Sequence, residues 1–430
     1  MRLGIFLAHD VKWWRVCKRG NALTELANTN AKFYAAGGDA EPPPTIICLS
    51  HLRWDFVWQR PQQLLSRFAR TRRVYFIEEP IFESSAGHAS DGASFRFNRG
   101  PVGVPPSTNL TGVVTAQPIC RDPGAGGGQV LDEMYAHLLK ELVASENIGR
   151  YVLWFYTPML LPAIGDLCPE AVVYDAMDEL SLFRFAPPEL VPRELELLAR
   201  AQVVFAGGRS LGEAKSRMHP RVFTLPSGVE IEHFRKALDP ATTVPVDLEA
   251  IPGPRVGYFG VIDERMDLEL LGKVSDLRPD VSWVMIGPVL KIEETDLPRK
   301  ANIHYLGSKK YAELPNYVRG LDVCMMPFAL NDATKFISPT KTLEYMAAHR
   351  IIVSTPVIDV VKSYGDVVSI GATAADFAAL VDLALAENET DRLGRIGREQ
   401  AVLERNTWDA IARTMDDELR AVCPEPVGVR

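Results

Sequence analysis

The sequence predicts an α/β protein with two domains, each a doubly wound parallel sheet, that face each other across a cleft. Three observations support this prediction. The chain has 430 residues, which is more than one domain usually holds. Short apolar runs of strand length alternate with helical stretches along most of the chain. A proline-rich stretch of little periodicity, residues 236–254, divides these runs into two series.

The first series begins after residues 1–44, which form an extension of uncertain order. Continuous apolar runs are typical of strands that are buried on both faces. Helical stretches lie between them, for example at residues 59–70 and 129–144. The predicted first domain spans residues 45–235. Its apolar runs are at residues 45–50, 73–79, 112–119, 151–157, 171–176 and 201–207.

The second series follows the predicted linker, residues 236–254, and repeats the architecture without repeating the sequence. A long helical region at about residues 373–422 ends it. The predicted second domain spans residues 255–422, and both domains are expected to be Rossmann-like, with ligands at the carboxyl ends of the strands. The apolar runs are at residues 255–260, 281–287, 301–307, 321–328, 350–356 and 366–371.

Composition narrows the classes of function. The chain is 47% hydrophobic and 24% charged, and its net charge of −8 argues against broad nucleic-acid binding. Six cysteines without a CxxC motif indicate free thiols in a reducing, cytoplasmic compartment. No apolar run has the length of a membrane-spanning helix, and no signal peptide is evident. Trp13 and Trp14 suit peripheral contact with the inner face of a membrane, although a poorly ordered extension or an over-early start codon is the simpler interpretation.

The stretch FISPTKTLEYMAA, residues 336–348, has a lysine where a helix is expected to begin. A serine can cap this helix, and a proline suits its first position. Backbone N–H groups, a hydroxyl and an ammonium group would then converge on one point, which suits a phosphate. An ordinary surface pair of lysine and glutamate is the alternative, but the place of this turn after a strand favours the anion site. The residues concerned are Ser338, Pro339, Thr340, Lys341 and Glu344.

The stretch GYFGVIDERMD, residues 257–267, is a second candidate. The strand ends at Gly260, where the missing side chain lets a ligand approach the backbone. A helix is expected to start near Asp263, which would put Arg265 in the first turn, again a cation at a positive helix end. Two such cations predict a diphosphate between them. A helix capped by Asp263, with Arg265 in solvent, is the alternative.

The turn after the first strand, residues 50–63, contains no glycine, which argues against a dinucleotide in the first domain. The glycine-rich DPGAGGGQV, residues 122–130, departs from GxGxxG and is expected to be a flexible loop. Trp54 and Trp58 could stack on a sugar or pack in the core, and both interpretations stay open. The turn also offers three polar side chains to a ligand, His51, Asp55 and Arg60.

Two carboxylates follow the strand at residues 171–176, at the edge where a ligand is expected. One of them could deprotonate an acceptor hydroxyl, and the other could cap the next helix. Asp178 is the candidate catalytic base, and Asp175 is its alternative. The sequence has no HExxH motif, no His–Cys cluster and no spaced set of carboxylates, so neither a metal nor a cofactor is expected.

Taken together, these stretches resemble a bacterial nucleotide-sugar glycosyltransferase of the GT-B fold, near glycosyltransferase family 4 and teichuronic-acid-type transferases. The resemblance covers about residues 45–420. It rests on DFVWQRPQQLL (55–65), HPRVFTLPSGVEIEHF (219–234), GYFGVIDER (257–265), NIHYLGSKKYAELPNYV (302–318) and FISPTKTLEYMAAHRIIVSTP (336–356).

The resemblance implies that the second domain binds the donor nucleotide and the first domain binds the acceptor. His51, Asp55 and Arg60 are therefore the candidate acceptor-side residues. Glu344 matches the residue that holds the donor ribose, and Arg265 and Lys341 match contacts to the diphosphate. The strand end at Leu306–Gly307 matches the backbone that pairs with the base. Retaining members carry a second glutamate in this motif, but Phe336 stands at that position here, so the stereochemical outcome is not implied.

The expected function is the transfer of a sugar from a nucleoside-diphosphate sugar of the UDP or GDP type to a glycan or lipid-linked acceptor. Cell-envelope polysaccharide synthesis is the expected setting. Lys341 and Arg265 could neutralise the leaving diphosphate without a metal. The alternatives are a sugar-nucleotide 2-epimerase of related fold and a non-catalytic partner that binds sugar nucleotides.

Overall fold

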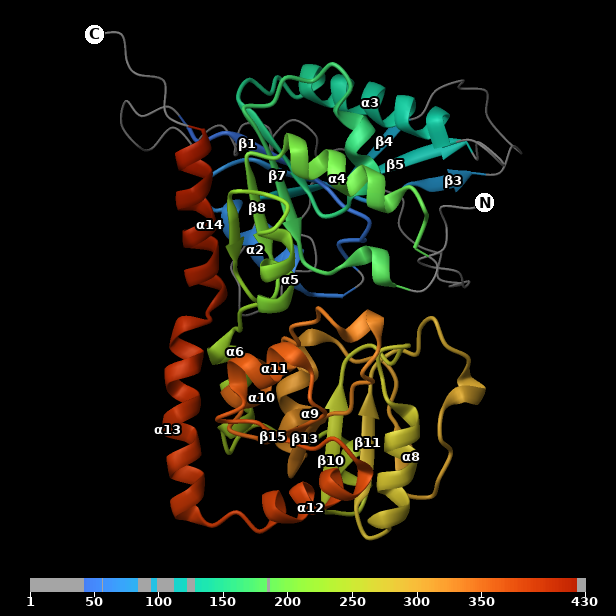
Figure 1. Ribbon diagram of the computed structural model, residues 1–430, viewed down its shortest axis with the longest axis vertical. Coiled ribbons are helices and arrows are strands. Elements are labelled where there is room, and N and C mark those ends of the chain that lie inside the picture. The colour runs from blue at the N-terminus through green and yellow to red at the C-terminus, as the bar shows by residue number, and fades with distance from the viewer. Residues whose placement is uncertain are drawn as a thin grey trace.

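The structure, a computed structural model, describes residues 42–55, 57–83, 94–98, 112–121, 128–183 and 186–423. Trp13, Trp14 and most of the glycine-rich stretch lie outside the described residues. The chain forms two sheets with helices packed against them, one above the other in Figure 1. The predicted fold class, with two doubly wound parallel sheets, is confirmed.

The first sheet has the strand order β3-β5-β2-β1-β6-β7-β8-β9, and these neighbours pair in parallel. In the central strand β1, Ile47 pairs with Tyr75 on one side and with Leu153 on the other. All five residues of β1 are buried, as a continuous apolar run predicts. The strands are β1 (Thr45–Leu49), β2 (Val74–Ile77), β3 (Ile81–Glu83), β4 (Ser94–Asn98, antiparallel to β5), β5 (Val113–Arg121), β6 (Tyr151–Phe155), β7 (Ala171–Ala176), β8 (Val203–Ala206) and β9 (Val222–Thr224). The helices are α2 (Arg60–Phe68), α3 (Gly128–Ser145), α4 (Leu190–Arg200) and α5 (Arg209–Lys215).

The second sheet has the order β12-β11-β10-β13-β14-β15, again all parallel. The direction of winding reverses between β10 and β13, and in the first sheet between β1 and β6. Ligands of such sheets bind at the carboxyl ends of the strands beside the reversal. The strands are β10 (Arg255–Phe259), β11 (Ser282–Ile286), β12 (Ile303–Tyr305), β13 (Val323–Met326), β14 (Ile351–Ser354) and β15 (Ser369–Ile370). The helices are α6 (Ile231–Arg235), α7 (Val246–Glu249), α8 (Leu268–Leu277), α9 (Leu314–Arg319), α10 (Lys341–Ala347), α11 (Ile358–Tyr364), α12 (Ala374–Leu385) and α13 (Glu389–Arg405).

The link between the sheets differs from the expected one. The chain crosses from the first sheet near Val229, whose N–H donates to the carbonyl oxygen of Asn406 on the returning strand (2.9 Å). The predicted linker, residues 236–254, instead packs on the second sheet, where Leu248 and Ile251 join its apolar core. The prolines correctly predict irregular backbone in this segment, but they do not predict whether the segment packs on a sheet.

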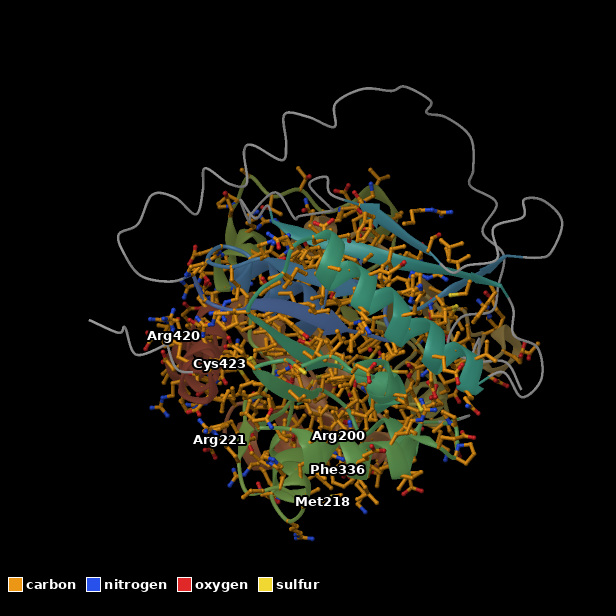
Figure 2. All side chains as sticks on the ribbon, turned by 90° about the horizontal axis from the view of Figure 1, so that it is seen from above. Arg200, Met218, Arg221, Phe336, Arg420 and Cys423 are labelled. Atoms are coloured by element: carbon orange, nitrogen blue, oxygen red, sulfur yellow. The ribbon has the colours of Figure 1, made fainter. Side chains whose placement is uncertain are left out.

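The last helix, α14 (Trp408–Val422), also differs from the expected assignment to the second domain. It packs against α2 and β8, and its fully buried Met415 lies in a core cluster of the first sheet. Figure 1 shows α13 beside the second sheet and α14 beside the first. Arg420 on α14 lies on the same side of the first domain as Arg221, which precedes β9 (Figure 2). The end of the described chain therefore fastens the two domains together.

A carboxylate of the second domain also caps a helix of the first. Asp359 on α11 accepts the backbone N–H groups of Arg209 (2.7 Å) and Ser210 (2.9 Å) at the start of α5. Its side chain is buried, and a Cβ at Gly208 would lie 2.6 Å from its Oδ2 atom. Asp359 thus caps α5 from the second domain and holds the two domains in contact there.

Asp359→Ala should lower the free energy of unfolding by about 1–2 kcal/mol, because two N–H groups of α5 lose their acceptor. Lys362→Ala on the same helix removes the exposed ion pair with Glu213 (2.9 Å) and should lower stability much less, because water screens this pair. Chemical denaturation measures both variants. Equal losses in the two variants would contradict the capping role.

Candidate functional site

Two glycines shape the second sheet where β10 and β11 end. Gly260 (φ +143°) and Gly287 (φ +151°) have backbone conformations that favour glycine. A Cβ at Gly287 would lie 1.8 Å from the carbonyl oxygen of Gly260, and a Cβ at Gly260 would lie 2.8 Å from Cε of Lys341. The lysine stem therefore crosses the end of β10. The sequence predicts Gly260 for the site but not Gly287, although both end apolar runs.

The helix that carries Lys341 begins later than expected. α10 starts at Lys341, and Thr340 in the cap position makes no side-chain capping hydrogen bond. The prediction that Ser338 caps the helix is wrong, because Ser338 and Pro339 precede the cap position. The N–H of Thr342 donates to the carbonyl oxygen of Pro339 instead (3.2 Å). An anion here would depend on the Lys341 ammonium, whose Nζ lies 3.5 Å from Oγ1 of Thr340, more than on the helix end.

Lys341 and Glu344 carry charges that burial disfavours. Burial lowers the pKa of Lys341, and Arg265 adds to this effect, while Glu344 opposes it. Burial raises the pKa of Glu344, and Glu230 adds to this effect, while Lys341 opposes it. Among the described residues, Oε2 of Glu344 is buried without a hydrogen-bond partner. Such an atom can accept a hydroxyl of a ligand at little cost.

Arg265 lies in a turn and not in a helix. α8 begins at Leu268, and its cap is Asp267, whose carboxylate accepts the N–H of Leu270 (2.8 Å). The expected helix start near Asp263 is therefore wrong, and Arg265 does not face a helix dipole. Asp263 holds it instead, with Nε–Oδ1 at 2.9 Å and Nη2–Oδ2 at 2.7 Å. Burial opposes the charge of Arg265, but the Asp263 carboxylate outweighs this effect and raises the pKa, so the guanidinium stays charged.

Asp178 of the first domain faces cations of the second. Burial raises the pKa of its carboxyl, and Arg265 and Lys291 partly offset this rise. Lys291 lies in the loop after β11 with φ +62°, and its Nζ is 4.5 Å from the ring centroid of Phe183 and 3.7 Å from Oε1 of Glu264. The sequence does not single out Lys291, whose only signal is its place after a strand end. Within the described part of the chain, no group of three or more His, Cys, Asp and Glu residues is arranged to hold a metal ion.

The acceptor-side candidates His51 and Asp55 have different surroundings. Burial and the nearby Lys291 lower the pKa of His51 to about 4. A hydrogen bond with the backbone of Tyr156 raises the pKa and only partly offsets this effect. The imidazole is therefore neutral at neutral pH and lies at the reversal point of the first sheet. Asp55 is exposed and interacts with another carboxylate, Glu78. The structure thus brings His51, but not Asp55, to the junction of the domains.

Arg60, the third acceptor-side candidate, supports the fold. Its Nη2 lies 2.9 Å from Oδ1 of Asp175, and the two side chains are 3% and 0% exposed. Its Nη1 donates to the carbonyl oxygen of Leu225 (2.7 Å). The guanidinium therefore joins α2 to β7 and is turned away from solvent. Trp54 packs in the core against Phe76, with ring centroids 5.0 Å apart, which favours packing over sugar stacking for this tryptophan.

Leu306 and Gly307 follow the outer strand β12. The N–H of Leu306 donates to the carbonyl oxygen of Met285 (2.9 Å). Gly307 has φ +67°, and no atom of the described residues lies within 4 Å of where its Cβ would be. The backbone of this strand end is therefore accessible on one side.

Phe336 contacts the other domain. It belongs to the loop before α10, yet it packs against an apolar core cluster of the first sheet. A Cβ at Gly208 would lie 3.0 Å from Cβ of Ser338, so this loop touches the first domain closely. Phe336 thus fastens the loop before α10 to the first domain.

Asp175→Asn should lower the free energy of unfolding by roughly 3–5 kcal/mol, because Arg60 would become a buried charge without an anionic partner.

Asp178→Asn should leave the free energy of unfolding at pH 7 unchanged or raise it. The pKa of Asp178 is raised in the folded state, so its contribution to stability is present at low pH and is lost as the pH rises through that value. The asparagine side chain cannot ionise, so the variant does not lose this stability. Chemical denaturation tests both variants, and an equally harmful Asp178→Asn would make Asp178 a structural residue.

No family model matches the chain. One relative is a protein of Bacillus subtilis (strain 168) named "Putative teichuronic acid biosynthesis glycosyltransferase TuaH". The two are 24% identical over 253 residues, which are 53% of this chain and 62% of the relative. The chain therefore matches less than two thirds of the length of that protein.

Several solved structures match nearly the whole chain. A structure described as trehalose-6-phosphate from E. coli bound with UDP-2-fluoro glucose has a TM-score of 0.62 at 12% identity, over 87% of this chain and 99% of its own. Sucrose-phosphate synthase from Thermosynechococcus elongatus has a TM-score of 0.63 at 14% identity, over 88% and 99%. HepE from Anabaena, in complex with UDP and glucose, has a TM-score of 0.60 at 12% identity, over 88% and 100%. The chain therefore has the two-domain GT-B fold that is found among glycosyltransferases.

Proposed function

We propose that this protein is a glycosyltransferase that moves a sugar from a nucleoside-diphosphate sugar to a glycan or lipid-linked acceptor in cell-envelope polysaccharide synthesis. The observation that carries the proposal is the group of half-buried charges where the domains meet. Lys341, Arg265 and Glu344 lie on the second domain, and Asp178 faces them from the first. The name of the Bacillus subtilis relative supports the setting.

The donor would lie on the second domain. Glu344 would accept the ribose hydroxyls with its unpartnered Oε2 atom, and the backbone at Leu306 and Gly307 would pair with the base. Lys341 and Arg265 would face the diphosphate, whose negative charge compensates the ammonium that burial disfavours. We favour UDP over GDP, because two of the similar structures contain UDP or a UDP-sugar.

The reaction would proceed between the two domains. The acceptor hydroxyl would give its proton to Asp178, and its oxygen would bond to the anomeric carbon while the bond from that carbon to the diphosphate oxygen breaks. Lys341 and Arg265 would stabilise the charge that develops on the leaving diphosphate. A raised pKa suits Asp178 to this role, because a general base works best when its pKa lies near the working pH.

The proposed location is the cytoplasm. The five cysteines in the described part of the chain, among them the exposed Cys168, are free thiols. None of the described helices combines the length and hydrophobicity that crossing a bilayer requires. Peripheral contact through Trp13 and Trp14 stays a prediction.

Asp178→Asn should cut turnover by about 10²–10⁴ and leave the affinity for UDP near wild type, because the amide cannot accept the proton. The release of UDP from UDP-sugars, with a cell-envelope fraction as acceptor, measures turnover. Asp55→Asn changes an exposed carboxylate of the first domain and should keep full turnover.

Full turnover by Asp178→Asn would remove this residue from the mechanism. A free epimer released by the wild-type protein would indicate a 2-epimerase, and tight binding of UDP-sugars without any product would indicate a non-catalytic partner.

Lys341→Met keeps the stem of the side chain and removes its charge. Without ligand, the melting temperature should stay the same or rise, because burial disfavours the ammonium. With UDP, the variant should gain much less than wild type, since the diphosphate loses a cation. Lys273→Met on α8, where the lysine is 62% exposed, should keep the full gain. An undiminished gain in Lys341→Met would show that Lys341 does not face the donor.

A further inference from the structure

The two chain segments that cross between the domains, at Val229 and at Thr407, lie side by side. Val229 forms a parallel bridge with Thr407, and a Cβ at Gly228 would lie 2.7 Å from the backbone nitrogen of Trp408. The neighbouring residue Glu230 is therefore held at a fixed place between the domains. Its side chain is 9% exposed.

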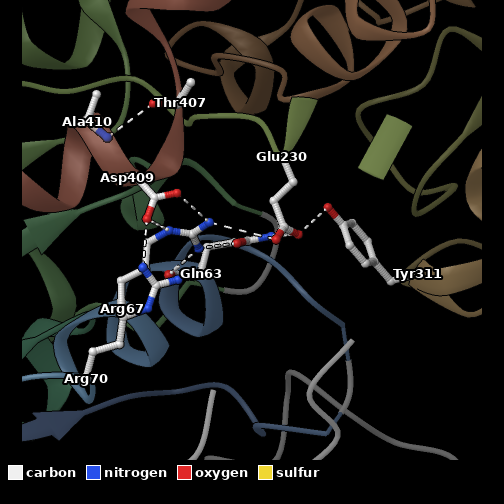
Figure 3. Close-up of polar contacts among 8 residues, drawn as sticks. All are labelled: Gln63, Arg67, Arg70, Glu230, Tyr311, Thr407, Asp409 and Ala410. Atoms are coloured by element: carbon white, nitrogen blue, oxygen red, sulfur yellow. Dashed lines mark hydrogen bonds and ion pairs between the residues drawn. The ribbon is translucent and has the colours of Figure 1, made fainter. Parts of the chain in front are cut away.

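The carboxylate of Glu230 joins both domains (Figure 3). Its Oε2 accepts two hydrogen bonds, one from Nε2 of Gln63 on α2 (2.9 Å) and one from the hydroxyl of Tyr311 in the second domain (2.8 Å). Its Oε1 lies 3.8 Å from Nη2 of Arg67, also on α2. Arg67 in turn pairs with Asp409 in the first turn of α14, with Nε–Oδ1 at 3.3 Å. One acidic side chain thus connects the first domain to the segment that follows Gly307.

Tyr311 is fixed by more than this hydrogen bond. Its ring stacks on His233, with centroids 4.3 Å apart and planes 8° apart, and meets Phe234 edge-on at 5.8 Å. Its carbonyl oxygen lies 3.0 Å from Nε2 of His233. Because His233 and Phe234 belong to α6, the segment after Glu230 holds the segment after Gly307 in place.

The same segment packs against the helix of the proposed donor site. α6 contacts α10, which carries Lys341 and Glu344. Among the described residues, five side chains interact electrostatically with Glu344. Lys341 on α10 and Glu230 before α6 act on its carboxyl, which in turn acts on the hydroxyls of three tyrosines: Tyr258 on β10, Tyr311, and Tyr345 on α10.

We propose that Glu230 is a positioning residue of the donor site, which fixes Tyr311, sets the electrostatic surroundings of Glu344 and so links nucleotide binding to the contact between the domains. This inference rests on the proposed function, because it takes Glu344 as the group that accepts the ribose hydroxyls. Glu230 acts through Tyr311 and Glu344 and need not touch the nucleotide.

The consequence is a pH dependence of a definite sign. Burial, and then the charge of Glu230, raise the pKa of Glu344. The ribose contact needs the ionised carboxylate, so the affinity for UDP should fall as the pH drops through that raised value. Removing the charge of Glu230 should lower the pKa of Glu344 and move the fall in affinity to lower pH.

Calorimetric titration of the full chain with UDP between about pH 5 and pH 8 tests this. Glu230→Gln keeps the shape of the side chain and should move the midpoint of the affinity profile to lower pH. Glu230→Asp keeps the charge and should stay near the wild-type midpoint. Asp409→Asn is the matched control, because Asp409 belongs to the same polar network but is not among the groups that interact with Glu344.

Two results would overturn the inference: an unmoved midpoint in Glu230→Gln, or an equal movement in Asp409→Asn. A wild-type protein that binds neither UDP nor GDP at any pH would instead refute the proposed function. The failure of the inference is thereby distinguishable from the failure of the donor assignment.

Discussion

Charge that is partly or wholly removed from water near the junction of the two domains is the constraint on which the rest of the structure depends. A charged side chain that leaves water needs an opposite charge or a ligand, or its ionised form becomes unfavourable. Burial raises the pKa of Asp175 and of Glu344 alike. Asp175 nevertheless has an ion pair with Arg60 at 2.9 Å, and this pair supports the fold. Among the described residues, Oε2 of Glu344 has no hydrogen-bond partner, so a ligand could complete this site.

Both sheets could be predicted, because strands buried on both faces leave continuous apolar runs. The partner of an amphipathic helix could not, since the pattern of α14 reveals a buried face but not the sheet that buries it. The predicted start of α8 near Asp263 is wrong for a local reason. Asp263 and Asp267 can both cap a helix, but the cap of α8 is Asp267, and the carboxylate of Asp263 binds Arg265.

In the candidate site, the residues that could be predicted have a local signal. Gly260 ends a strand, Lys341 stands at a helix start, and Asp178 follows a strand end. Glu230 has no such signal, and Lys291 has only its place in the loop after a strand, because the surroundings of both arise when distant segments meet. For Arg60 the local signal was misleading. It lies in a turn where a ligand was expected, but its guanidinium pairs with the buried carboxylate of Asp175.

Titration of the full chain with UDP and with uridine, compared by calorimetry, tests the central claim most directly. The half-buried cations Lys341 and Arg265 are proposed to face the diphosphate, so uridine should lack the contacts with them. Each hydrogen bond to a charged group is worth about 1.5–3 kcal/mol, so UDP should bind about 100-fold more tightly than uridine, or tighter still. Equal affinities for UDP and uridine would contradict the account.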